Sequence, residues 1–169
     1  MTTLTVHAAT VGVVVPMLQN LDKMLEKAEA HAQARKLEPG VLEGLRLAPD
    51  MFALSRQVQL TCDFAKNGVY RLAGIDPPKM PDEEKTLGEL RGRVTRTLAL
   101  IEAVTPDKLE GTLDRLVTVP LRTRTLELEG LPYIQRWTLP NFFFHLTTVY
   151  ALLRNAGVEL GKQDFLGGV

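Results

Sequence analysis

Four stretches of the chain repeat apolar residues at intervals of three and four, and this periodicity constrains the fold more than any other feature. They lie at about 6–35, 50–73, 82–104 and 139–155. Such spacing places apolar side chains on one face of a helix, which must then be buried against another element. A chain of 169 residues suits one domain with a sizeable core. The sequence therefore predicts a single, mainly α-helical bundle domain over residues 1–169.

Caps and breakers set the expected limits of these helices. Pro16 falls inside the first helix and should kink it, because the apolar pattern continues beyond the proline. Asp50 is a suitable N-cap for the second helix, and Gly74 ends that helix. The third helix is expected to start near Asp82, with carboxylates in its first turn. Thr138 is the expected N-cap of the fourth helix.

Residues 115–137 break the helical pattern. Residues 116–119 and 123–128 are β-branched or alternate between apolar and polar, a Glu-Gly turn signal follows, and residues 133–137 alternate again. We expect this segment to form a small β-hairpin before the last helix. Residues 161–167 are expected to form an irregular tail.

The charge balance argues against two classes of partner. The 20 basic and 20 acidic residues give a formal net charge of zero, whereas binding to nucleic acid or to an anionic membrane normally needs a basic excess. Arg91, Arg93 and Arg96 are interspersed with Glu84 and Glu89, which suggests a solvated helix face. No apolar run is long enough to span a bilayer. We therefore expect neither nucleic acid nor a membrane as a partner.

A single cysteine, Cys62, excludes an intrachain disulfide, so the chain does not require an oxidising compartment and a cytoplasmic location is expected. Cys62 falls on the apolar stripe of the predicted second helix. Burial there would raise its pKa and make the thiol inert, so a nucleophilic role is not expected.

The fourth predicted helix is apolar almost all round. Phe142, Phe144, Ala151 and Leu152 carry apolar surface beyond what one buried face needs. A helix of this kind is either central to its bundle or buried in an interface, and we expect a homodimer.

Polar side chains on the second and fourth helices are the candidates for a functional site. His145 lies beside Asn141 on the flank of the fourth helix, Tyr150 follows on the same helix, and the second helix carries Gln59 and Asp63. These five side chains could line a small-molecule pocket between helices. Two alternatives stay open: the second-helix residues could face solvent, and His145 could be a buried histidine held by one hydrogen bond or one at a subunit contact.

Five segments, in order along nearly the whole chain, carry a family signature. They are Arg46–Phe52, Gln57–Gln59, Leu72–Gly74, Leu139–His145 and Gly161–Gly167. Together they resemble domain-of-unknown-function family 1993 of bacteria and fungi, which lies within the DinB/YfiT-like superfamily. The resemblance implies a DinB-like four-helix bundle with an up-down-down-up connection and, often, a homodimer.

Many DinB-like proteins bind a divalent metal through one histidine on helix two and a His-x-x-x-His pair on the last helix, and some use it to activate a low-molecular-weight thiol. His145 matches the first member of the pair, but Val149 occupies the second position. The second helix has no histidine, so Gln57, Gln59 or Asp63 would have to substitute. Such a set would bind zinc or nickel poorly. No cofactor is therefore expected, and His145 is a weak candidate for a divalent-metal ligand.

Three functions are compatible with these residues. The first is a non-catalytic or small-molecule-binding homodimer that lacks the complete metal triad, and this is the main expectation. The second is a divergent metal-dependent enzyme of the thiol-dependent transferase class that uses His145, Asp63 and Gln59 as ligands. In the third, the polar side chains merely satisfy buried groups.

Overall fold

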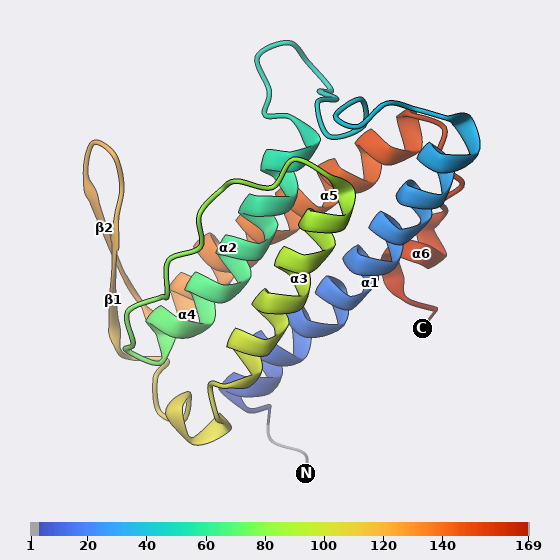
Figure 1. Ribbon diagram of the computed structural model, residues 1–169. Helices are drawn as coiled ribbons and strands as arrows, with labels where there is room; N and C mark the ends of the chain where they lie inside the picture. Colours follow the sequence, from blue (N-terminus) through green and yellow to red (C-terminus); the bar gives the residue numbers. More distant parts are fainter. Residues whose placement is uncertain (1–3, 169) are drawn as a thin grey trace.

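Four long helices build the protein, and the computed structural model describes residues 4–168. They are α1 (Val6–Arg35), α2 (Leu54–Leu72), α3 (Leu87–Glu102) and α5 (Leu139–Asn155). α2 packs against both α3 and α5, while α1 packs mainly against α3. In Figure 1, α1 and α5 run upwards and α2 and α3 run downwards, which is the expected up-down-down-up connection. The apolar stripes of all four helices meet in one core.

α1 has the limits that its periodicity predicts. The Thr5 side chain accepts a hydrogen bond from the Ala8 backbone N–H at 3.1 Å and caps the start of the helix. Lys36 ends it in the left-handed region, with φ of 53°. The helix continues through Pro16, as expected from the apolar pattern.

α2 begins later than the sequence predicts. It starts at Leu54 rather than near Asp50, which lies in a turn. The backbone N–H groups of Leu54 and Ser55 donate to the carbonyl oxygens of Leu45 and Glu43 in the preceding loop. These contacts with the loop satisfy the first donors of the helix, so an Asp50 cap is not needed.

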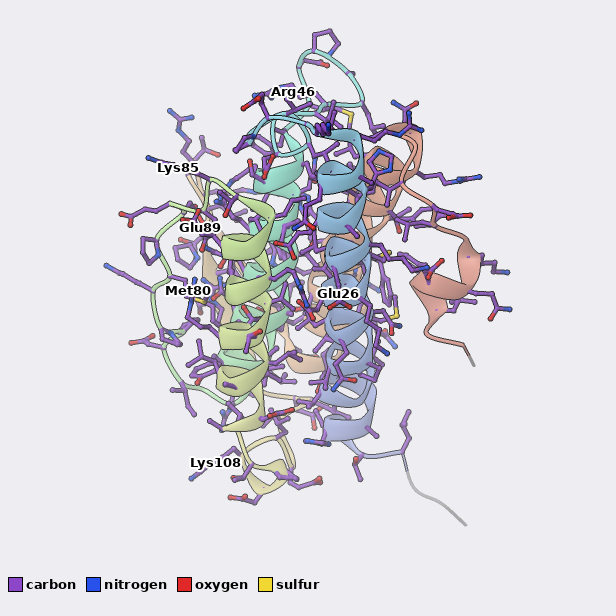
Figure 2. The ribbon with its side chains drawn as sticks, turned by 45° about the vertical axis from the view of Figure 1, so that its right-hand side comes forward. Glu26, Arg46, Met80, Lys85, Glu89 and Lys108 are labelled. Atoms are coloured by element: carbon purple, nitrogen blue, oxygen red, sulfur yellow. The ribbon has the colours of Figure 1, made fainter. Side chains whose placement is uncertain are left out.

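α3 also begins later, at Leu87 rather than near Asp82. Thr86 and Glu89 form a capping box, in which each side chain accepts a hydrogen bond from the other residue's backbone N–H. Glu89 also accepts from the Lys85 backbone N–H at 2.6 Å, and both residues lie at the start of α3 in Figure 2. These reciprocal bonds fix the helix start more firmly than the acidic residues upstream.

The strap, defined here as residues 75–86, connects the parallel helices α2 and α3. It has no helix before α3 and runs back along the outside of the two helices (Figure 1). Pro77, Pro78 and Pro81 favour this extended conformation, because proline disfavours the helical region for the residue before it. The strap covers Lys66 of α2 and Arg93 of α3, which are both buried and donate to the Pro78 and Pro81 carbonyls of the strap.

The expected hairpin is present but shorter than residues 115–137. β1 (Leu116–Pro120) and β2 (Thr125–Glu129) pair antiparallel, with Leu116 opposite Glu129. A short 3₁₀ turn, η1 (Pro106–Lys108), follows α3 and precedes the hairpin.

The residues after β2 are helical, which corrects the prediction that residues 133–137 belong to the hairpin. A single turn, α4 (Gly130–Pro132), leads into the π-helical segment η2 (Tyr133–Thr138), which continues directly into α5. Tyr133 and Ile134 are both buried, which a strand with one buried face would not allow. Thr138 has helical angles and makes no capping hydrogen bond, so the expected N-cap is also wrong.

The predicted irregular tail contains a short helix, α6 (Lys162–Leu166). α6 packs on α1, where Lys27 pairs with Asp164 at 2.7 Å and Asn20 Nδ2 donates to the Phe165 carbonyl at 3.2 Å. Across residues 4–168, no helix is both long enough and apolar enough to cross a bilayer.

Candidate functional site

A histidine and a glutamine form a buried pair between α2 and α5. His145 Nδ1 lies 2.7 Å from Gln57 Oε1, and both side chains are buried. The two residues come from the same helices that carry the metal triad of the resembled superfamily. The pair therefore marks the position at which a functional site of that kind is expected.

The hydrogen bonds of Gln57 define the protonation state of His145. Gln57 Nε2 donates to the Phe52 carbonyl at 3.2 Å, and a carbonyl can only accept. The amide oxygen must then face His145, so Nδ1 carries the proton and donates to it. Nε2 of the imidazole is left with its lone pair.

Aromatic rings surround the imidazole. Phe64 stacks on it with ring centroids 5.4 Å apart, and Phe144 meets it edge-on at 5.2 Å. Burial, and secondarily the positive charge of Arg56, lowers the pKa of His145 to about 4. The imidazole is therefore neutral at neutral pH.

The other four candidate residues do not join His145 in one site. Asn141 Nδ2 donates to the Trp137 carbonyl one turn earlier, at 2.7 Å. Tyr150 meets Phe165 edge-on, with ring centroids 5.8 Å apart. Gln59 and Asp63 contact residues of the strap and α3 instead of α5. Gln57 is the residue that pairs with His145. The sequence names it only as one of three possible substitutes for the missing histidine of the second helix, and that resemblance is the signal that points to it.

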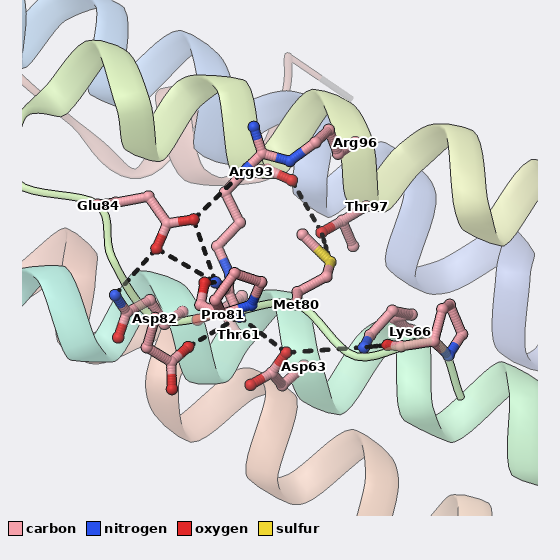
Figure 3. A network of polar contacts seen from close by, with 12 residues as sticks. Thr61, Asp63, Lys66, Met80, Pro81, Asp82, Glu84, Arg93, Arg96 and Thr97 are labelled. Atoms are coloured by element: carbon pink, nitrogen blue, oxygen red, sulfur yellow. Dashed lines mark hydrogen bonds and ion pairs between the residues drawn. The ribbon is translucent and has the colours of Figure 1, made fainter. Parts of the chain in front are cut away.

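A second polar cluster lies between α2, α3 and the strap, and it is centred on Arg93 (Figure 3). The Arg93 side chain has an exposed fraction of 0%. It contacts Asp63 at 2.9 Å, Asp82 at 3.0 Å and Glu84 at 3.1 Å. We call Arg93 and these three carboxylates the Arg93 cluster. The expectation of a solvated helix face is thus wrong for Arg93.

Further polar groups border the Arg93 cluster. Arg56 pairs with Asp82, Arg96 pairs with Glu84 at 3.2 Å, and Gln59 Nε2 donates to Glu84 at 3.0 Å. Gln59 is buried, so the alternative that the polar residues of the second helix face solvent is wrong for Gln59. These bonds hold the strap against both helices.

Burial shifts the pKa values of the groups around the Arg93 cluster. It raises the pKa of Asp63, against the opposing effect of Arg93, and it lowers the pKa of Lys66. Burial also works against the charge of Arg93, but the Asp63 and Glu84 carboxylates outweigh it and raise the pKa of Arg93. Burial raises the pKa of Cys62 to about 12, so the thiol is inert, as expected.

The residues present do not fit the metal site of DinB-like proteins. Val149 is fully buried where a second histidine would be needed, and its side chain has no donor atom. Gln59 and Asp63, the expected substitutes, are engaged by Glu84 and Arg93. Within residues 4–168, no three His, Cys, Asp or Glu side chains are grouped so that they could hold a metal ion.

Three features are typical of a DinB-like protein. They are the up-down-down-up order of the four long helices, the hairpin before the last helices and the histidine near the start of α5. The chain belongs to the family described as Domain of unknown function (DUF1993), whose model matches residues 6–166. It is similar to the crystal structure, at 1.83 Å resolution, of a DinB family member protein from Shewanella denitrificans. The two chains are 39% identical, with a TM-score of 0.90, over 96% of this chain and 92% of that one.

No curated protein matches the chain. The family resemblance inferred from the five sequence segments is confirmed by the family model and by the structural neighbour.

Proposed function

We propose that this protein is a metal-independent, non-catalytic small-molecule-binding protein that acts as a homodimer. The observation that carries the metal-independent part of the proposal is the buried Val149, which stands one turn after His145 where a second ligand would be needed. The candidate substitutes Gln59 and Asp63 are bonded to Glu84 and Arg93 instead.

The environment of His145 supports a structural role for its polar atoms. Phe64 and Phe144 surround the ring, and the buried Val149 follows one turn later. A metal centre normally needs at least three protein ligands, and zinc favours nitrogen and sulfur ligands. The described neighbours of His145 supply an amide and aromatic rings.

Exposed aromatic surface next to the pair supports the homodimer. Phe144 has an exposed fraction of 58% and Phe52 one of 56%. Both border the pair, because the Phe52 carbonyl binds Gln57 and the Phe144 ring contacts His145. Phe142 and Leu152, which also motivated a dimer, are buried inside the bundle, so the support for a dimer comes mainly from Phe144.

A divergent metal-dependent enzyme of the thiol-dependent transferase class is the second candidate. It is favoured by the tautomer of His145, because a histidine that donates from Nδ1 to an oxygen presents Nε2 in the form that ligates metals. This candidate would need further ligands, and Asp63 and Gln59 are already engaged in ion pairs and hydrogen bonds away from α5.

Metal analysis of the purified wild type and of His145→Ala separates the two candidates. The proposal expects substoichiometric metal in both proteins and a melting temperature that EDTA does not change. Stoichiometric metal in the wild type that is lost in His145→Ala would overturn it in favour of the enzyme.

A broad thermal-shift screen of small molecules and light scattering test the other parts of the proposal. A ligand at 100 times its dissociation constant should stabilise the protein by about 2.7 kcal/mol. A screen without any hit would remove the binding function, and a monomer at micromolar concentration would remove the dimer. We also propose a cytoplasmic location, since the buried Cys62 needs no oxidising compartment.

A further inference from the structure

A polar pocket lies where the strap crosses α2, on the side of the helix that carries Asp63. Its volume is about 550 Å³, which is in the range of small-molecule sites. It is lined by four residues of α2, among them Asp63, Lys66 and Arg71, and by residues 77–81 of the strap.

Lys66 provides a buried positive charge in the wall of this pocket. Its exposed fraction is 3%, and its ammonium donates to the Pro78 carbonyl of the strap (Figure 3). Asp63 Oδ1 lies 4.0 Å from the ammonium, too far for a hydrogen bond, and the same oxygen accepts from Arg93 at 2.9 Å. An ammonium group has three donors, and among residues 4–168 only the Pro78 carbonyl accepts from it.

The charges around the pocket do not cancel. Its wall carries three cations, Lys66, Arg71 and Lys79, against the single carboxylate of Asp63, which is already bonded to Arg93. Arg71 lines the pocket and forms no ion pair with any other residue of the described range 4–168. The pocket therefore has a local excess of positive charge, although the chain as a whole is neutral.

The cations are the polar groups of this wall that a ligand can use. Asn67 also lies in the wall, but its Oδ1 atom is buried out of reach of solvent and does not face the open pocket. The pocket thus offers donors and positive charge to a bound group.

We infer that this pocket binds a small carboxylate, which is held by Lys66 and Arg71. This inference rests on the proposed binding function and specifies its site and ligand class. Charge-assisted hydrogen bonds from the two cations give the affinity for the carboxylate.

Isothermal titration calorimetry with two probes at the same sodium concentration tests the inference. Gluconate carries the carboxylate, and sorbitol is a polyol of similar size that lacks it. We expect gluconate to bind at least tenfold more tightly than sorbitol. Equal affinity for the two probes, or no measurable binding of gluconate, would overturn the inference.

Two matched lysine variants locate the site. Lys66→Met should weaken gluconate binding at least tenfold, whereas Lys79→Met changes an exposed lysine of the same pocket and should change it less than threefold. If Lys66→Met does not fold, a second variant replaces it. Lys66→Arg retains the positive charge, and combined with Arg71→Gln it should still weaken gluconate binding. Unchanged binding in the folded Lys66→Met variant, or in Lys66→Arg combined with Arg71→Gln, would overturn the site.

The inference and the proposed function can fail separately. If gluconate does not bind but the broad screen gives hits, the pocket assignment fails and the binding function stands. If the screen gives no hit of any class, the proposed binding function fails as well.

Discussion

Gly68 of α2 lies directly against Thr138, the last residue of η2 before α5. A β-carbon at Gly68 would come within 2.3 Å of Thr138 Cγ2, so the two helices pack at a distance that only glycine permits. This contact lies on the α5-facing side of α2, as the His145–Gln57 pair does.

We predict that Gly68→Ala destabilises the protein by about 1–3 kcal/mol, because the added methyl group forces the helices apart. Gly92→Ala is the matched control, since a β-carbon there would meet only the flexible end of Arg96 at 3.6 Å. The control should stabilise α3 by about 0.5–1 kcal/mol. Urea denaturation measures both, and equal effects in the two variants would contradict the close packing.

His145 should make stability depend on pH. The unfolded chain takes up a proton near the ordinary pKa of 6.5, whereas the folded protein keeps His145 neutral down to about 4. The unfolded state therefore binds more protons between these values, so stability falls as the pH decreases from 6.5 to 4. The loss should approach about 3 kcal/mol. In His145→Asn this contribution is absent, and denaturation curves whose pH dependence matches the wild type would refute the buried neutral imidazole.

Replacing Gln57 tests the hydrogen bond itself. Gln57→Leu leaves both the His145 Nδ1–H and the Phe52 carbonyl without their partner, and we expect a loss of about 1–3 kcal/mol for the buried donor. Gln33→Leu, at an exposed position of α1, should change stability by less than about 0.5 kcal/mol. Thermal and urea melts of the two variants provide the comparison, and similar values would show that the pair contributes little.

Arg93 should hold the strap in place. Arg93→Met leaves Asp63, Asp82 and Glu84 close together without their shared counter-charge, and breaking a buried ion pair in this way costs about 3–5 kcal/mol. Hydrogen exchange should rise in the strap before it rises in α1. Arg91→Met removes a more exposed arginine that pairs with α1 and should cost about 1 kcal/mol or less. Strap exchange that is equal in the two variants would contradict this role.

The helix limits show which parts of the fold can be predicted from sequence. The limits of α1 and α5 agree with prediction, because their periodic apolar patterns are long and continuous. The starts of α2 and α3 do not agree. α2 is capped by carbonyls of a loop that only the folded chain brings close, and the acidic residues read as the first turn of α3 belong to the strap.

The candidate site could be predicted only in part. The sequence places His145 on the flank of the last helix. Its partner depends on how α2 is rotated in the bundle, and periodicity identifies the buried face of α2 but not the residue on it that meets His145. The burial of Arg93 could not be predicted either. Arg93 is polar in any hydrophobicity pattern, and residues 82–86 of the strap that covers it are predicted to be helical.

The parallel arrangement of α2 and α3 sets a minimum length for their connection. α2 has 19 residues and is roughly 28 Å long, so the chain needs about nine extended residues to return along it. The segment between Leu72 and Leu87 is longer than this. No short turn could therefore replace the connection without reversing the direction of α3.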